Sequence, residues 1–292
     1  MTRGALMLLV WLAALLASDR AGACATCSSG DPTLTTAGTE QPFAGRLRAA
    51  IEGRYRTDRV GQAGVDQMDI RELSTLISIA WAPRAELLLM ADVPLLYRRV
   101  GDPSLARVDT ASVGDVALRA KWFMLRDRAF SPRVLLALLG GLELPTAVWH
   151  DGIPLEAQAG TGSLDVSLGP SLALFAGDVS GYASALWFEP IQSRRALTPG
   201  RSLRASGALQ YQLSQAFAVR GLSELRWDQQ SREAGQPDPN SGGAMLAAGG
   251  ELLLSPLADR TIVLGARVPV LERWHGAHDE GPLYSLALVG DF

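Results

Sequence analysis

The last nine residues of the chain alternate strictly between two kinds of side chain. One face of this stretch is apolar and carries an aromatic residue at each end: Tyr284, Leu286, Leu288, Gly290 and Phe292. Side chains of an extended strand alternate between two faces, so the stretch reads as a β-strand. An apolar face between two aromatic residues is typical of a strand that meets lipid on one side. A strand of a soluble sandwich shows the same pattern, so the rest of the chain has to decide between them.

The same alternation recurs along the chain. Its clearest instance is residues 46–56, where Arg46, Arg48, Glu52, Arg54 and Arg56 share one face and apolar residues occupy the other. That face is too charged for the core of a soluble protein. We count about 12 such segments, each near the 9–11 residues that a tilted strand needs to cross a bilayer.

The connections between these segments alternate between short and long. Short turns such as 82–85 and 214–215 are followed by long polar loops such as 58–69, 101–112, 145–163 and 272–282. A meander of this kind gathers all long loops at one end, as outer-membrane barrels do and Greek-key sandwiches do not. The sequence therefore predicts an all-β fold over residues 45–292, a transmembrane antiparallel up-and-down β-barrel of about 12 strands. An even strand count puts the N- and C-termini at the same end, in the periplasm, with the barrel in the cell outer membrane.

The first residues predict export in a Gram-negative bacterium. Arg3 is followed by the apolar run 5–16 and by small residues at 21–23, the three parts of a secretory signal peptide over residues 1–23. The apolar run is shorter than the roughly 20 residues of a membrane-spanning helix. Residues 24–44 would then form a periplasmic segment.

Cys24 and Cys27 follow the predicted cleavage site. Cys24 is a candidate for lipidation, although the residues before it lack the usual Leu, and the two cysteines are alternatively a disulfide or a metal-binding pair in an oxidising compartment. Covalent haem is excluded because Ser28 stands where attachment needs His. A single Cys-x-x-Cys pair does not complete a zinc site.

The barrel pattern assigns each strand an outer and an inner face. Aromatic residues near strand ends are expected in the two interfacial girdles: Tyr55, Trp81, Tyr97, Trp122, Tyr182, Trp227, Tyr284 and Phe292. Charged residues of the opposite faces are expected to line the lumen: Arg46, Arg48, Glu52, Arg54, Arg56, Asp115, Arg119, Lys121, Glu143, Asp165, Arg204, Arg220, Glu224, Arg226, Glu251 and Arg267. Both signs are present, so most of these charges can pair across the lumen.

Short motifs resemble a known family. The run Gly-Leu-Glu-Leu-Pro-Thr at 141–146, a long loop and Gly-Ser-Leu-Asp at 162–165 resemble transporter-like outer-membrane proteins of the phenol-degradation MetA type. Val-Pro-Leu at 93–95 and Gly114-Asp115 are similar too, whereas Ala147 stands where that family has Gly. The resemblance covers residues 44–292 and implies an outer-membrane channel, with small aromatic or other hydrophobic compounds as expected solutes.

The last strand also resembles the terminal strand of bacterial outer-membrane barrels, which typically ends in Phe. This resemblance implies that the assembly machinery of the outer membrane recognises the strand ending in Phe292. Outer-membrane lipid and a small-molecule solute are the other expected partners. Slight negative net charge without a basic run gives no indication of nucleic-acid binding.

Catalysis and metal binding find little support. The three histidines, His150, His275 and His278, fall in predicted loops, away from the Ser–His arrangement of a membrane phospholipase. His275 and His278 lie near two acidic residues but lack a third imidazole or thiol, so a solvated loop is favoured over a metal site. No cofactor is predicted. The sequence predicts a passive channel for small molecules. The alternative is a barrel whose polar lumen is plugged and which serves as a membrane anchor or a partner-binding protein. An outer-membrane enzyme is a remote alternative.

Overall fold

The computed structural model describes most of the chain after residue 43. The described residues are 44–65, 67–101, 107–128, 132–150, 152–153, 157–193, 197–233, 235–238, 241–257 and 259–292. The predicted signal peptide and the predicted sites at Cys24 and Cys27 lie outside these residues. Within them, no helix has the length and apolar character needed to cross a membrane.

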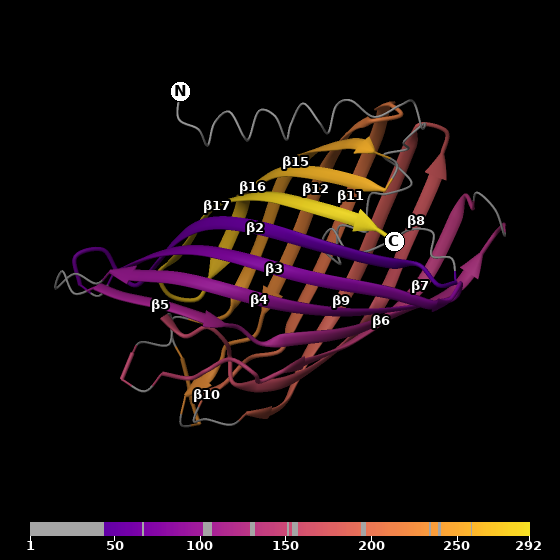
Figure 1. Cartoon of the computed structure of the whole chain (residues 1–292). Coiled ribbons are helices and arrows are strands. Elements are labelled where there is room, and N and C mark those ends of the chain that lie inside the picture. The colour runs from indigo at the N-terminus through magenta and orange to yellow at the C-terminus, as the bar shows by residue number, and fades with distance from the viewer. Residues whose placement is uncertain are drawn as a thin grey trace, which may run out of the picture.

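Twelve antiparallel strands form a closed ring (Figure 1). They are β2 (Leu47–Val60), β3 (Met68–Arg84), β4 (Leu87–Gly101), β6 (Val116–Arg126), β7 (Val134–Leu144), β8 (Ser163–Ala176), β9 (Val179–Ser193), β11 (Ser202–Ser214), β12 (Phe217–Asp228), β15 (Gly243–Leu257), β16 (Arg260–Trp274) and β17 (His278–Asp291). The last strand pairs with the first, and β3 pairs with β4, so the sheet returns on itself. The predicted all-β antiparallel barrel of 12 strands is confirmed.

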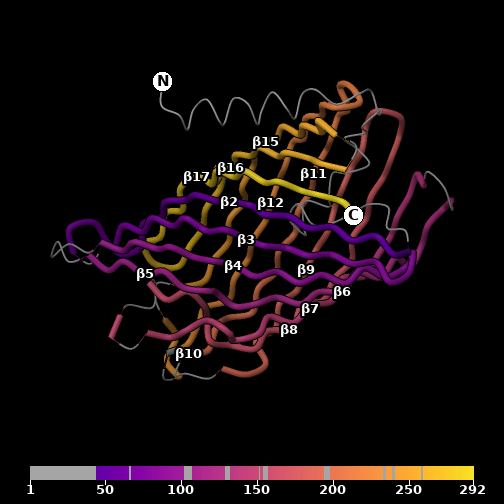
Figure 2. The backbone as a smooth tube through the Cα atoms, in the orientation of Figure 1, coloured from indigo at the N-terminus to yellow at the C-terminus, as the bar shows by residue number. Residues whose placement is uncertain are grey.

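Besides these twelve strands, the described residues form four shorter ones. β5 (Arg107–Val113) continues the line of β6 and pairs with β4, whereas β10 (Leu197–Thr198), β13 (Arg232–Glu233) and β14 (Gln236–Pro237) form a small separate sheet. The sequence had placed β5 in a loop. In the backbone trace, the loop that joins β2 to β3 lies at one end of the barrel, on the left, and the C-terminus lies toward the other end (Figure 2). We call the former the loop end, and the end with the short links and the C-terminus the turn end.

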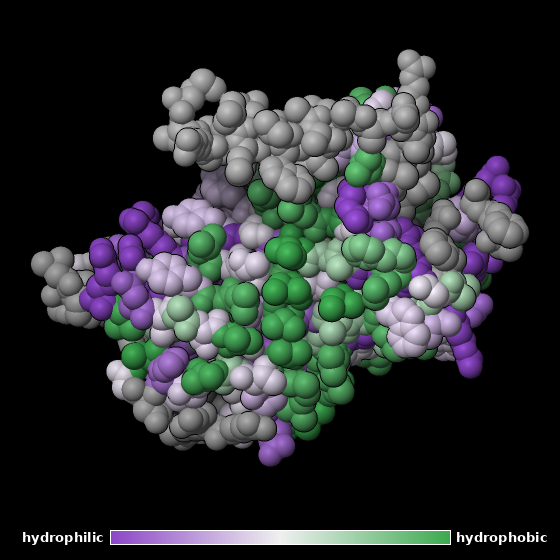
Figure 3. All heavy atoms as spheres, viewed as in Figure 1, coloured by the Kyte–Doolittle hydropathy of each residue, from purple (hydrophilic) through white to green (hydrophobic). Residues whose placement is uncertain are grey.

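The apolar faces of the strands point outward. Ile51 and Leu288 expose 54% and 56% of their surface, whereas Glu52, their neighbour on the inner face, exposes only 5%. One side of the molecule shows apolar residues in a central band and hydrophilic residues toward both ends (Figure 3). A band of this kind, with the backbone hydrogen bonds satisfied inside the sheet, is what a hydrocarbon environment requires.

Aromatic residues mark the two edges of the apolar band. Tyr284 pairs with Tyr55, and Tyr97 lies two strands further in the same cross-strand line, forming a tyrosine row toward the loop end. Trp81 and Trp122 are exposed near the turn end, at 49% and 54%. The predicted girdles are therefore present at both edges.

The prediction for one girdle residue, Tyr182, is wrong. Tyr182 points into the barrel, exposes only 4% of its surface and packs edge-on against Phe175, with ring centroids 6.1 Å apart. The outer face of β9 carries Ala183, Ala185 and the exposed Trp187 instead. Both faces of this strand are apolar, so hydropathy alone did not identify the outer one.

The strands extend further than the alternation predicted. The predicted loop 272–282 is reduced to residues 275–277, because β16 and β17 continue as a hairpin beyond the tyrosine row. The predicted loop 58–69 is likewise shortened to 61–67. Backbone pairing does not depend on apolar side chains, so hairpins persist where the outer face is already polar.

A buried charge cluster joins the first and last strands at the turn end. Asp291 accepts hydrogen bonds from Arg46 (Nη2, 2.7 Å) and from Arg48 (Nε, 2.7 Å), residues that are 245 and 243 positions away in the chain. The side chains expose 14%, 10% and 1%, respectively. Both arginines were predicted to line the lumen. In the structure they bind Asp291 where the first and last strands of the ring meet.

The closure of the ring is predicted to depend on this cluster. Asp291→Asn removes the negative charge from between two buried guanidinium groups, and breaking a buried ion pair in this way costs roughly 3–5 kcal/mol. We expect a corresponding loss in the free energy of unfolding, measured by urea denaturation of the protein in lipid vesicles. Asp259→Asn is the control, since Asp259 pairs with Arg260 in an exposed turn. Equal losses in the two variants would contradict the proposed role of the cluster.

Candidate functional site: the barrel lumen

The inner faces of the strands enclose a cavity of about 340 Å³. Ten of the residues predicted to line the lumen contribute to its wall: Glu52, Arg54, Arg56, Arg119, Arg204, Arg220, Glu224, Arg226, Glu251 and Arg267. The sequence thus identified the charged face of the central barrel. Glu280, which the sequence placed in a loop, also lines the cavity.

Most charges of the cavity wall are paired with opposite charges. Glu52 accepts a hydrogen bond from Arg54 of the same strand at 2.8 Å. Glu251 lies 3.0 Å from the guanidinium of Arg220, its direct cross-strand partner. Pairing of this kind lowers the cost of placing charges in a partly desolvated interior.

Other pairs connect different strands, and one of them reaches across an intervening strand. Arg267 donates to Glu224 at 2.7 Å, from β16 to β12 across β15. Arg119 forms a hydrogen bond with Asp92, a buried carboxylate that also accepts from the hydroxyl of Ser78 at 2.5 Å. The charges therefore form cross-links on the inner wall.

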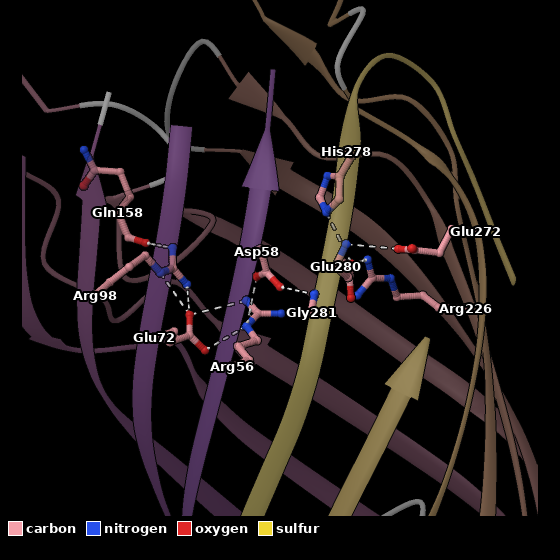
Figure 4. Close-up of polar contacts among 10 residues, drawn as sticks. All are labelled: Arg56, Asp58, Glu72, Arg98, Gln158, Arg226, Glu272, His278, Glu280 and Gly281. Atoms are coloured by element: carbon pink, nitrogen blue, oxygen red, sulfur yellow. Dashed lines mark hydrogen bonds and ion pairs between the residues drawn. The ribbon is translucent and has the colours of Figure 1, made fainter. Parts of the chain in front are cut away.

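A second polar cluster lies at the loop end, beyond the tyrosine row (Figure 4). Glu72 on β3 accepts hydrogen bonds from Arg98 and from Arg56, at 2.9 Å and 3.3 Å. Arg56 also lies 3.4 Å from Asp58, which accepts a long hydrogen bond from the backbone N–H of Gly281. The cluster spans β4, β3, β2 and β17, and we call it the rim network.

Glu280 extends the rim network to the other side of the mouth. It forms a hydrogen bond with Arg226 of β12, and its Oε1 lies 3.5 Å from Nε2 of His278. Its backbone N–H donates to Glu272 at 3.0 Å, which fixes the hairpin between β16 and β17. The imidazole of His278 packs on Trp274 with ring centroids 4.9 Å apart.

Two carboxyl groups of the rim network differ in acidity. Burial, the largest effect, raises the pKa of Asp58, and the charge of Arg56 offsets it only in part. Burial alone would also raise the pKa of Glu280, but His278, Arg226 and Arg56 outweigh it and lower the pKa to about 2. Glu280 is therefore ionised throughout the physiological range.

The long loop between β7 and β8 folds back into the mouth of the barrel. Ala157 is fully buried against inward-facing Val60, Ile70 and Val100. Arg98 of the rim network donates to the carbonyl of Gln158 at 2.7 Å. The loop thus narrows the lumen at this end, whereas the sequence predicted only a polar loop.

Asp115 holds the two ends of this loop together. Its carboxylate accepts hydrogen bonds from the backbone N–H of Ala147 at 3.0 Å and from that of Thr161 at 2.8 Å. The residue lies between β5 and β6, where Gly114 donates to the carbonyl of Pro94 at 2.8 Å. Its carboxylate is engaged by the loop, a role that alternation alone does not reveal.

The turn end of the lumen is largely apolar. Phe123, Leu135 and Leu139 are nearly fully buried and pack together on the inner faces of β6 and β7. Lys121, predicted to line the lumen, is 3% exposed, with its ammonium group 5.2 Å from the centre of the Phe123 ring. The lumen therefore changes from charged at the loop end to apolar on this side of the turn end.

Glu143 and Asp165 lie opposite each other on β7 and β8 at the base of the inward loop. Asp165 accepts a hydrogen bond from Ser163 at 2.6 Å. Among the described residues, no arginine or lysine lies within ion-pair distance of either carboxyl group. These two carboxyl groups form an acidic pair on β7 and β8, whereas arginines predominate on the cavity wall.

The histidines are not gathered into a metal site. Within the part of the chain that the structure describes, no group of three His, Cys, Asp or Glu residues is arranged to hold a metal ion. The backbone N–H of His150 donates to Gln158 within the inward loop.

Comparison with known proteins finds the same fold in solved structures. No protein-family model matches the chain, and no curated protein matches it in sequence. Its structure is similar to an outer membrane channel from Pseudomonas putida F1, with a TM-score of 0.66 at 14% identity, covering 86% of this chain and 97% of that one. It is also similar to the translocator domain of the autotransporter NalP from Neisseria meningitidis, with a TM-score of 0.50 at 11% identity, covering 86% and 89%. Likeness at these identities defines the fold, a closed antiparallel barrel of the kind found in those two proteins.

The inward loop is predicted to depend on Asp115. Asp115→Ala removes the acceptor of at least two hydrogen bonds to a charged group, each contributing roughly 1.5–3 kcal/mol. We expect chymotrypsin to cleave the loop at least about tenfold faster in the folded barrel. Asp109→Ala is the matched control, because Asp109 pairs with Arg99 on the exposed outer face. Unchanged cleavage in Asp115→Ala would contradict the assignment.

The rim network gives a pH-dependent prediction. The pKa of Glu280 is about 2 in the folded protein, against 4.5 for an unperturbed Glu, so its ionised form stabilises the fold above pH 4.5. The free-energy difference between wild type and Glu280→Gln should be constant from pH 8 to about pH 5 and shrink as the pH falls toward 2. Denaturation in vesicles at a series of pH values measures it. A difference that grows on acidification would contradict the prediction.

Proposed function

We propose that the chain is an outer-membrane barrel that acts as a passive channel for small molecules. The loop end would face the outside of the cell and both termini the periplasm, as the sequence indicates for a barrel of even strand number. The likeness to a solved outer membrane channel supports this reading through the fold. The motifs at 141–146 and 162–165 support membership of the transporter-like family that they resemble.

The observation that carries the proposal is the water-accessible cavity inside a ring whose outer face is apolar. A barrel whose only task is anchorage has no need of a cavity of about 340 Å³ lined by arginine and glutamate. Charged groups on a pore wall select solutes by charge and hold water in the passage. The inward loop and the rim network would then limit the size of solutes that enter.

The apolar part of the lumen bears on the solute. Phe123, Leu135 and Tyr182 belong to the cluster of inward-facing apolar side chains near the turn end. A solute on its way to the periplasm would pass this surface after the charged cavity. This arrangement supports hydrophobic or aromatic solutes, in agreement with the family that the sequence resembles.

A plugged barrel is the second candidate, and the same apolar cluster favours it. Packed side chains at the turn end and a folded loop at the mouth would close the lumen to ions. The protein would then serve as a membrane anchor or bind a partner through residues 24–44. Conductance separates the two candidates.

The terminal strand supports the proposed route of assembly. Phe292 exposes 68% of its surface, with the guanidinium of Arg260 4.8 Å from its ring centre. An accessible aromatic C-terminus on an edge-forming strand fits recognition by the assembly machinery before the ring closes.

Single-channel conductance in a planar bilayer tests the proposal. We expect steady conductance from the refolded protein, and a shift of the cation-to-anion permeability ratio of about twofold or more in charge variants. Arg119→Ala leaves the buried carboxylate of Asp92 unpaired and should favour cations, whereas Glu143→Ala should favour anions. A barrel that migrates as a heat-resistant folded species without conductance would exclude the open channel and favour the plugged barrel.

A further inference from the structure

Arg204 differs from the other arginines of the cavity. Six others lie within 3.4 Å of a carboxylate oxygen in the described structure: Arg54, Arg56, Arg119, Arg220, Arg226 and Arg267. Arg204 has no carboxylate within ion-pair distance among the described residues, and its side chain is exposed on the inner face of β11. Its guanidinium group is therefore accessible from the cavity.

A second positive charge lies directly beside it. Arg204 pairs in register with Arg226 of β12, and both side chains point into the cavity. Like charges directly opposite each other on neighbouring strands are unfavourable. Arg226 is partly neutralised by Glu280 and Asp228, whereas no carboxylate of the described residues lies in ion-pair contact with Arg204.

The cavity as a whole has an excess of positive groups. Seven arginines and four glutamates line its wall. Glu143 and Asp165 face Arg204 from β7 and β8, but neither is in ion-pair contact with it. An anion in the cavity would meet the guanidinium group of Arg204, whose fork of N–H donors matches the geometry of a carboxylate.

The surface beneath Arg204 is apolar. Its guanidinium carbon lies 4.7 Å from the ring centre of Phe188, and Leu186 is its register partner on β9. Met245, the register partner of Arg226 on β15, also lines the cavity. The positive group is thus bordered by side chains that bind hydrocarbon, within a volume typical of small-molecule sites, about 300–1,000 Å³.

We propose that Arg204, Arg226 and Phe188 form a binding site for small organic carboxylates. The carboxylate of the ligand accepts hydrogen bonds from the two guanidinium groups, and its apolar body lies against Phe188 and Leu186. This assignment rests on the proposed channel function and names the class of solute that the channel would select.

Benzoate and its neutral counterpart benzyl alcohol are the probes. We measure the reduction of single-channel current at increasing concentrations of each, and heat release on mixing with the folded protein in detergent micelles. Benzoate should reduce the current and bind, and benzyl alcohol should do so much more weakly. Arg204→Gln should raise the half-saturating benzoate concentration about tenfold, the loss expected for one hydrogen bond to a charged group.

Two further variants sharpen the test. Arg71→Gln removes the same charge from the exposed outer face of β3 and should leave benzoate binding unchanged. Phe188→Ala should weaken binding of benzoate more than binding of acetate, because acetate lacks the apolar ring. Folded migration on gels confirms that each variant forms the barrel.

The outcomes separate the site from the channel. Binding in micelles without conductance would overturn the channel and leave the site standing. Conductance with equal effects of benzoate and benzyl alcohol, or with unchanged binding in Arg204→Gln, would overturn the site and leave the channel standing. Equal losses of benzoate binding in Arg204→Gln and Arg71→Gln would mean that only the net charge of the protein matters, which would also overturn the site.

Discussion

Closure of the sheet is the constraint on which the rest of this structure depends. In hydrocarbon, water does not satisfy backbone N–H and C=O groups, so an open edge would leave a row of them unpaired. The pairing of β17 with β2 removes the two edges that the chain would otherwise expose. Asp291 holds this seam together because its single carboxylate engages two arginines at the start of the described barrel. The ionic cluster therefore lies where the two paired strands, β17 and β2, are farthest apart in the sequence.

A closed ring also decides which inner charges meet. Partners lie two positions apart on one strand, as in Arg54 and Glu52, directly across a ladder, as in Arg220 and Glu251, or two strands apart, as in Arg267 and Glu224. Each pair needs the register of the whole barrel to be correct. The pairs in turn oppose slippage of the strands, since a shift by one residue would place the charges in lipid. The ion pairs of the inner wall and the apolar side chains of the outer band therefore both favour the same strand register.

The parts of this fold that the sequence revealed are those governed by period two. The outer faces of β2 and β6 could be predicted because one face is apolar and the other carries several charges. Tyr182 was misplaced because both faces of β9 are apolar, and nothing local distinguishes lipid from an apolar lumen. Asp115 could be assigned to the inside but not to the loop that it holds, since its partners Ala147 and Thr161 lie more than 30 positions away. Alternation determines the direction of a side chain, and only the closed structure determines its contacts.

In the proposed channel, the distinction between paired and unpaired charges decides which groups of the lumen act on a passing solute. A guanidinium in contact with a carboxylate presents a dipole, whose field falls off faster with distance than that of a single charge, and water in the lumen weakens it further. Among the described residues, Arg204 has no carboxylate within ion-pair distance on the cavity wall, and Glu143 and Asp165 have no arginine or lysine within that distance at the base of the inward loop. The two kinds of unpaired charge have opposite sign and occupy different strands. An anionic solute would therefore be drawn toward β11 and away from β7 and β8, so the lumen has a preferred side as well as a preferred charge.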